Sequence, residues 1–183
     1  MKNLFLKILL LSGIPFGLLT GIFSLLHGEM KDAIINAVLS GLMFGTLTAY
    51  ILISLHKSLS RKVMAGTSMH DYGIHQVRHV TTGMPYEQAF SLCIQSLKTI
   101  HRCHIISQSR DTGEIRAATG INWKTWSDEI YFRLTGNEEM TEIEVSSRPS
   151  AKSTFVDFGK NLDNVERITR FLRSSKKADH SEK

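Results

Sequence analysis

The densest cluster of side chains that could bind a metal or act as a nucleophile is His101-Arg102-Cys103-His104. Side chains alternate between the faces of a strand, so His101 and Cys103 would share one face there. Two ligands do not hold an ion, because a protein metal site normally uses three or four. A second group of histidines also lacks a thiol or carboxylate cluster to complete it: His70, His75 and His79. We therefore expect no metal and no other cofactor.

Other short motifs fall short of catalytic machinery. Asp157-Phe158-Gly159 matches the magnesium-binding triplet of protein kinases, but the glycine-rich and catalytic loops of a kinase are missing. Gly159-Lys160 lacks the upstream glycine and the following Ser or Thr of a phosphate loop. Neighbouring carboxylates such as Asp128-Glu129 and Glu138-Glu139 would point to opposite faces of a strand and could not act as a pair. The sequence predicts no catalytic residues and no enzyme.

Two tryptophans lie close together in the second half of the chain, beside a lysine. Packing in a core is the commoner role of tryptophan, but this combination also suits a membrane interface or a protein groove. Basic residues that follow the apolar part of the chain suit the same surface. The candidate contacts with a membrane surface or partner are Lys57, Arg61, Lys62, Trp123 and Trp126.

Two kinds of segment must position these candidates: strongly apolar runs near the start of the chain, and a polar remainder that predicts a small domain. The runs Ile8–Leu26 and Ala33–Leu55 contain no charged residue. Because about 20 helical residues cross the hydrocarbon core of a bilayer, each run is long enough to span it. Only His27–Asp32 separates them, so the helices must return beside each other. The sequence predicts a transmembrane hairpin over residues 1–55, uncleaved because no Ala-x-Ala site follows the first run.

The charges around the hairpin predict its orientation. Basic residues flank the outer ends of both runs, whereas the break contains one lysine and two carboxylates. Positive flanks stay in the cytoplasm, so we expect a multi-pass protein of the bacterial inner membrane with both termini cytoplasmic. Cys93 and Cys103 would then be free thiols in a reducing compartment. The net charge of +5 suits an anionic membrane surface better than nucleic acid.

Small residues recur at every fourth position in both apolar runs. Such stripes allow helix backbones to approach closely in a membrane. The two stripes could join the hairpin, or one could face another subunit in an oligomer; a pore is the remotest interpretation, because neither run has an ionisable residue. The helix-packing candidates are Gly13, Gly17, Gly21, Ala37, Gly41 and Gly45.

The rest of the chain predicts one small cytoplasmic domain. We expect a basic linker at 56–84, a domain at 85–173 and a disordered tail at 174–183. Apolar periodicity predicts a helix from Pro85 to about His101 and a second helix ending near residue 173. The second has Asn161 or Asp163 as its expected cap.

Alternating segments between these helices predict four short strands, at about 103–109, 114–119, 129–134 and 140–147. Their connections are too short for crossover helices, so we expect an antiparallel meander with both helices on one face. The predicted fold class is α+β: a transmembrane hairpin followed by a four-stranded sheet and two helices.

Three motifs of this domain carry a resemblance: Thr112–Ala117, Ser147-Arg148, and Asp157-x-Gly159-x-Asn161 before a helix containing Asn164-Val165 and Phe171-Leu172. On these motifs, Pro85–Leu172 resembles domains of unknown function, ordered helix, four strands, helix, in uncharacterised bacterial membrane proteins. The resemblance covers about half of the chain and implies no activity.

The sequence therefore favours a membrane-anchored adaptor that is not an enzyme and that holds a protein partner or self-associates. The alternative is a membrane-tethered sensor that binds a small hydrophobic ligand or lipid between the sheet and the helices. Candidate residues for that pocket are Phe90, Leu97, Phe132 and Phe171. The expected partners are the lipid bilayer and a protein, and not nucleic acid.

Overall fold

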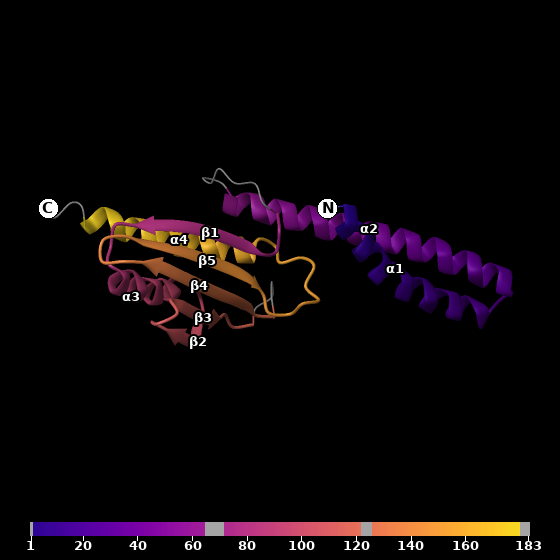
Figure 1. The fold of residues 1–183 in the computed structure, drawn as a ribbon. Helices are drawn as coiled ribbons and strands as arrows, with labels where there is room; N and C mark the ends of the chain where they lie inside the picture. Colours follow the sequence, from indigo (N-terminus) through magenta and orange to yellow (C-terminus); the bar gives the residue numbers. More distant parts are fainter. Residues whose placement is uncertain (1, 65–71, 122–125, 180–183) are drawn as a thin grey trace. The chain divides into compact units, whose positions relative to one another are not determined.

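The computed structural model describes residues 2–64, 72–121 and 126–179 and divides the chain into two compact units, residues 1–58 and 59–183. Figure 1 shows helices α1 and α2 followed by a mixed unit of sheet and helix. The elements are α1 (Lys2–Leu25), α2 (Met30–Met64), β1 (Gln76–Thr82), α3 (Tyr86–Ser96), the short 3-10 helix η1 (Leu97–Thr99), β2 (His104–Ser109), β3 (Glu114–Ala118), β4 (Asp128–Gly136), β5 (Thr141–Pro149) and α4 (Lys160–Asp179).

In the first unit, α1 and α2 approach each other along their small residues. A Cβ added to Gly13 would lie 2.6 Å from the carbonyl oxygen of Gly41, and one added to Gly17 would lie 2.5 Å from that of Ala37. No side chain larger than hydrogen fits at such distances without moving a backbone. The two stripes of small residues therefore face each other within one chain, including the remaining members Gly21 and Gly45.

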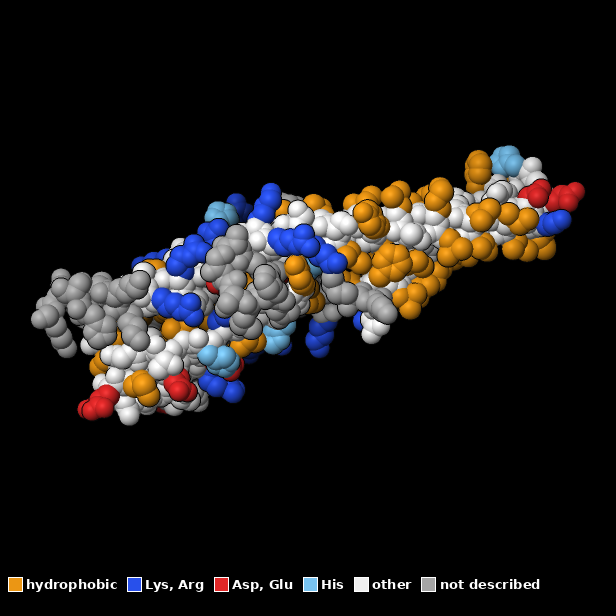
Figure 2. All heavy atoms as spheres, turned by 90° about the horizontal axis from the view of Figure 1, so that it is seen from above, with side chains coloured by type: hydrophobic (Ala, Val, Ile, Leu, Met, Phe, Trp, Pro, Cys, Tyr) orange, Lys and Arg blue, Asp and Glu red, His pale blue; other side chains and the backbone are white. Residues whose placement is uncertain are grey.

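The outer surfaces of α1 and α2 are apolar. Both helices are long and apolar enough to cross a membrane, and only 17% of the most apolar window of each is buried. Figure 2 shows hydrophobic side chains covering this part of the chain. The core helix of a soluble protein would be mostly buried, whereas an N-terminal signal sequence shares this length and composition.

The second unit contains five strands rather than the four expected from the sequence. The antiparallel sheet has the order β1-β5-β4-β3-β2. The additional strand is β1, which lies within the segment expected to be a linker and pairs with β5 from Gln76↔Ser147 to Thr82↔Thr141. Its inward positions include the polar residues Gln76 and Arg78, both buried, so the alternation that marks a half-buried strand is hidden.

Helices α3 and α4 cover one face of this sheet (Figure 1). The other face is polar, because the outward positions of β4 and β5 carry mostly charged and polar side chains. The core between the helices and the sheet is apolar; its fully buried members are Ala89, Phe90, Cys93, Ile115, Phe132, Ile130, Val145, Val165, Ile168 and Leu172. The α+β class is confirmed. Helix α4 continues to Asp179, beyond residue 174 where a disordered tail was expected.

Candidate ligand groove and the polar network behind it

A groove of about 340 Å³ lies on the outer face of the sheet, away from α3 and α4. This volume is within the range of small-molecule sites, which begins at about 300 Å³. Strands β3, β4 and β5 supply most of its walls, because alternate residues on each strand point outward. The lining side chains are His75, Ile106, Glu114, Arg116, Glu129, Tyr131, Ser146 and Arg148.

Strand register brings the polar lining residues together. Arg116 lies opposite Tyr131 in the β3–β4 pair, and Tyr131 lies opposite Ser146 in the β4–β5 pair. Glu129 lies opposite Arg148, and the Arg148 guanidinium donates to one oxygen of the Glu129 carboxylate at 2.7 and 3.0 Å. Side chains facing the same way on adjacent strands are direct neighbours, so these residues form one continuous surface.

One cation of this groove has no ion-pair partner among the residues that the structure describes. The Tyr131 hydroxyl donates to Glu114, which also lies 3.8 Å from Arg133, and Glu129 is engaged by Arg148. The Arg116 side chain is exposed, and its guanidinium makes no hydrogen bond or ion pair with the residues that the structure describes. The groove thus offers an unpaired guanidinium, a fork of donors that matches carboxylate or phosphate oxygens.

Tyr131 forms the aromatic part of the groove. Desolvation, followed by the hydrogen bond to Glu114, raises the pKa of the Tyr131 phenol, so its proton is retained. The same groove is lined by Ile106, which is one of the few large apolar side chains exposed in this unit. A ligand with an anionic group and a flat or apolar part would meet both surfaces.

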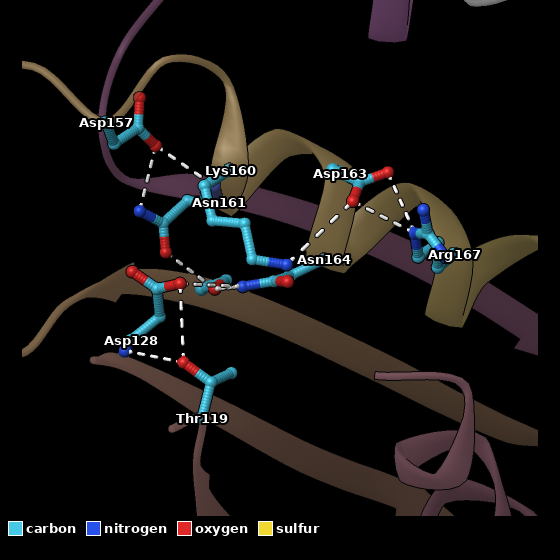
Figure 3. A network of polar contacts seen from close by, with 9 residues as sticks. Thr119, Asp128, Asp157, Lys160, Asn161, Asp163, Asn164 and Arg167 are labelled. Carbon is cyan, nitrogen blue, oxygen red and sulfur yellow. Dashed lines mark hydrogen bonds and ion pairs between the residues drawn. The ribbon is translucent and has the colours of Figure 1, made fainter. Parts of the chain in front are cut away.

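Directly behind the groove, on the inner face of the same strands, is a buried polar network (Figure 3). Its members are 0–2% exposed: Thr119, Asp128, Ser147, Asp157, Asn161 and Asn164. Ser147 donates to Asn161 at 2.7 Å, while the Asn164 amide donates to Ser147 at 3.1 Å and to Asp128 at 3.3 Å. The network therefore joins the first turns of α4 to β4 and β5.

Asp157 fixes the turn into α4. Its carboxylate accepts from the backbone N–H of Gly159 at 3.1 Å and from the backbone N–H of Asn161 at 3.0 Å. Asp157 is thus the acidic residue that caps the helix, whereas Asp163, one of the expected caps, pairs with Arg167. Phe158 and Gly159 both have left-handed backbones, at φ +53° and +76°.

Gly159 also permits a close contact with the last turns of α2. A Cβ there would lie 2.9 Å from the Cα of Ser60, which is closer than real Cβ contacts come. Ser60 is buried and belongs to the second unit. The chain thus enters this unit beside the first turn of α4.

A buried ion pair joins α4 to the first strand of the sheet. The Arg78 guanidinium donates to Glu166 at 2.8 Å, and both side chains are largely buried, at 10% and 11% exposure. Arg78 also donates to the Val77 carbonyl oxygen at 2.8 Å. Two carboxylates and an ion pair thus lie between α4 and the sheet, next to the apolar core.

The candidate residues for a hydrophobic pocket lie on the helix side of the sheet. Phe90, Leu97 and Phe132 are packed in the apolar core, and Phe171 is half-buried. The accessible groove lies on the opposite face and is largely polar. The sequence carries a signal for this face, because Arg116 and Tyr131 alternate with apolar residues in two of the expected strands. Strand β1, which was not expected, completes the sheet beside β5.

The other predicted residues are scattered. Trp126 is 77% exposed, Arg61 and Lys62 are exposed, and Lys57 is half-buried. Trp123 and His70 lie outside the described residues. Cys93 is buried and Cys103 is half-buried, both as free thiols. Among the described residues, no three His, Cys, Asp or Glu side chains form a group that could hold a metal ion.

Comparisons with known proteins give similarity at the level of structure. No known family matches the sequence, and no curated protein matches it. Solved structures that match include TTHA0849 from Thermus thermophilus, at 7% identity and TM-score 0.34, covering 55% of this chain and 98% of that one. Ara h 8.0201 matches at 10% identity and TM-score 0.38, with 55% and 97% covered. The di-domain ARO/CYC StfQ from the steffimycin biosynthetic pathway matches at 8% identity and TM-score 0.34, with 85% and 62% covered. At these values the likenesses identify neither a ligand nor a reaction.

Proposed function

We propose that this chain is a membrane-anchored binding protein without catalytic activity, in which the second unit binds a small anionic ligand in the outer groove. The proposal combines an apolar hairpin, which suits a bilayer, with a groove of suitable size and one uncompensated cation. The hairpin keeps the second unit at a membrane surface. The groove gives that unit a binding site.

The outward apolar surface of α1 and α2 supports the membrane part of the proposal. In water, exposed apolar patches larger than a few hundred Å² normally mark an interaction surface or cause aggregation. Lipid removes this cost, and small-residue stripes such as the one joining α1 to α2 are typical of helix packing in membranes. The basic flanks favour a cytoplasmic location for both termini under the positive-inside rule.

The single observation that supports ligand binding is the position of Arg116. It lines the groove opposite Tyr131, while the neighbouring carboxylates are engaged by Arg148, Tyr131 and Arg133. A carboxylate or phosphate group would pair with this guanidinium, and the ligand's apolar part would lie on Tyr131 and Ile106. The proposed ligand site is therefore on the face opposite the one expected from the sequence.

Native mass spectrometry of the full chain, released from its own membranes in mild detergent, tests this proposal. We expect an anionic small-molecule adduct on the wild-type chain and its loss in Arg116→Ala. Arg170→Ala is the matched control, because Arg170 is exposed on α4 and lies outside the groove. Absence of any adduct from the wild type, or an adduct that survives Arg116→Ala, would contradict the proposal.

A protein partner is the second candidate, and the edge strand β2 favours it. One side of β2 pairs with β3, and its other edge has no neighbouring strand among the described residues. Ile105 and Ile106 are 40% and 57% exposed there. An open edge can accept a strand from another chain, including a second copy of this one. Crosslinking in native membranes that links peptides through β2 would support this candidate over the ligand.

A further inference from the structure

One end of the sheet in the second unit combines exposed apolar side chains with basic ones. Strand register defines this end, because Asp128 lies opposite Pro149, and Ala118 lies opposite both His104 and Glu129. Ile121 follows β3 and is 65% exposed, and Trp126 precedes β4 and is 77% exposed. Both therefore project from the same end of the sheet.

Basic side chains accompany this apolar pair. The backbone N–H of Gly120 donates to the carbonyl oxygen of Arg102 at 2.9 Å, which places the exposed Arg102 beside the residue that precedes Ile121. Arg61 and Lys62 are exposed in the last turn of α2, next to Ser60, which packs on Gly159. The polar network ties the start of α4 to this same end through Asn164 and Asp128, so the chain arrives from the hairpin here.

The turns at the opposite end of the sheet expose carboxylates. The turn between β2 and β3 exposes Asp111, and the turn between β4 and β5 exposes Glu138 and Glu139. An anionic bilayer attracts basic groups by about 1 kcal/mol each and repels carboxylates. The exposed carboxylates of these turns are thus separated along the sheet from the basic residues near the point where the chain enters, although the exposed Arg170 and Arg173 of α4 also lie toward the end that carries these carboxylates.

We infer that this end of the second unit, carrying Ile121 and Trp126 with Arg102, Arg61 and Lys62, lies against the headgroups of the anionic leaflet that holds the hairpin. The inference rests on the proposed membrane anchoring. Tryptophan favours the membrane interface, where its ring meets the acyl boundary and its N–H meets water. The basic residues pair with lipid phosphates, and the acidic turns point away.

Fluorescence quenching of the full chain in nanodiscs tests this arrangement. Trp123→Phe leaves Trp126 as the only tryptophan, and headgroup spin-labelled lipids quench tryptophans at the interface. We expect strong quenching in phosphatidylglycerol-containing discs, a loss of most of it with phosphatidylcholine alone, and a similar loss in Arg102→Glu. The matched control moves the probe to the turn between β4 and β5 at the opposite end of the sheet, with Trp126→Phe and Met140→Trp, and should remain unquenched.

The two proposals fail separately. If the chain does not co-elute with the nanodiscs, the membrane anchoring itself is wrong. If it co-elutes and Trp126 is quenched no more than the probe at Met140→Trp, the hairpin is inserted and only the membrane-facing end is wrong. Quenching of Trp126 that does not depend on lipid charge or on Arg102 would also overturn the electrostatic part of the inference.

Discussion

In α1 and α2 the closest contacts join backbones at glycine, and the large apolar side chains point outward. In the second unit, by contrast, the large apolar side chains point inward from β3, β4, β5, α3 and α4, and ion pairs lie on the outer face. One chain therefore contains two opposite arrangements of the same kinds of residue. Each arrangement suits a different solvent, lipid for the first unit and water for the second.

The largest effect should come from filling the glycine contact in the hairpin. Gly17→Leu places a side chain where the Ala37 carbonyl oxygen now lies, so the two helices must separate. Thr20 and Ser40 have their hydroxyl oxygens 2.5 Å apart, and cysteines at both positions should form a disulfide within one chain. We expect Gly17→Leu to abolish this crosslink.

Gly28→Ala is the control, because the nearest atom to its added Cβ would be at 3.5 Å, an ordinary contact. It should leave the intrachain disulfide intact. A crosslink that joins two chains instead would favour the oligomer interpretation of the glycine stripes over the hairpin.

The core of the second unit should respond to truncation as a water-soluble core does. Phe132 is fully buried at the centre of the sheet. Phe132→Ala should lower the free energy of unfolding by about 3–5 kcal/mol, because apolar contacts are lost and a cavity remains. Urea unfolding of the full chain in detergent, followed by tryptophan emission, measures it. Ile106→Ala, at an exposed position, should cost less than about 1 kcal/mol; equal losses for the two variants would refute the assigned core.

Two variants test whether the buried Arg78–Glu166 ion pair adds net stability or only offsets the cost of burying its own two charges. Arg78→Leu leaves Glu166 buried without its partner and should cost about 3 kcal/mol. The double variant Arg78→Leu/Glu166→Leu should recover most of that loss, because an apolar pair replaces two paired charges. Chemical unfolding of both variants decides the point. If the double variant is as unstable as Arg78→Leu, the ion pair contributes to the free energy of unfolding beyond neutralising its own two charges.

The smallest effect concerns a thiol. Burial raises the pKa of Cys93 to about 12, from an ordinary value of 9.0. Above pH 9 the unfolded chain loses this proton while the folded chain keeps it, so stability falls as pH rises from 9 toward 12. Cys93→Ala should remove that part of the decline in denaturant midpoint. If the denaturant midpoint of Cys93→Ala falls with pH as steeply as that of the wild type, the Cys93 thiol is not the cause of the decline.

The class of the second unit and its outward residues followed from local patterns, because alternation and turn residues act over a few positions. Strand β1 was missed because its inward residues Gln76 and Arg78 are polar, and only the fold brings Glu166 to meet Arg78. Ser147, Asp157 and Asn161 belong to the motifs that carry the resemblance, but the sequence does not show what these residues do. In the structure they form a hydrogen-bonded network, which long-range packing assembles.

The central claim is that lipid surrounds α1 and α2. An alkaline carbonate wash of membranes from cells making the full chain tests it most directly, because the wash releases peripheral proteins and leaves inserted helices in the bilayer. We predict that the intact chain remains with the membrane pellet. Recovery of the chain in the washed supernatant would contradict the claim.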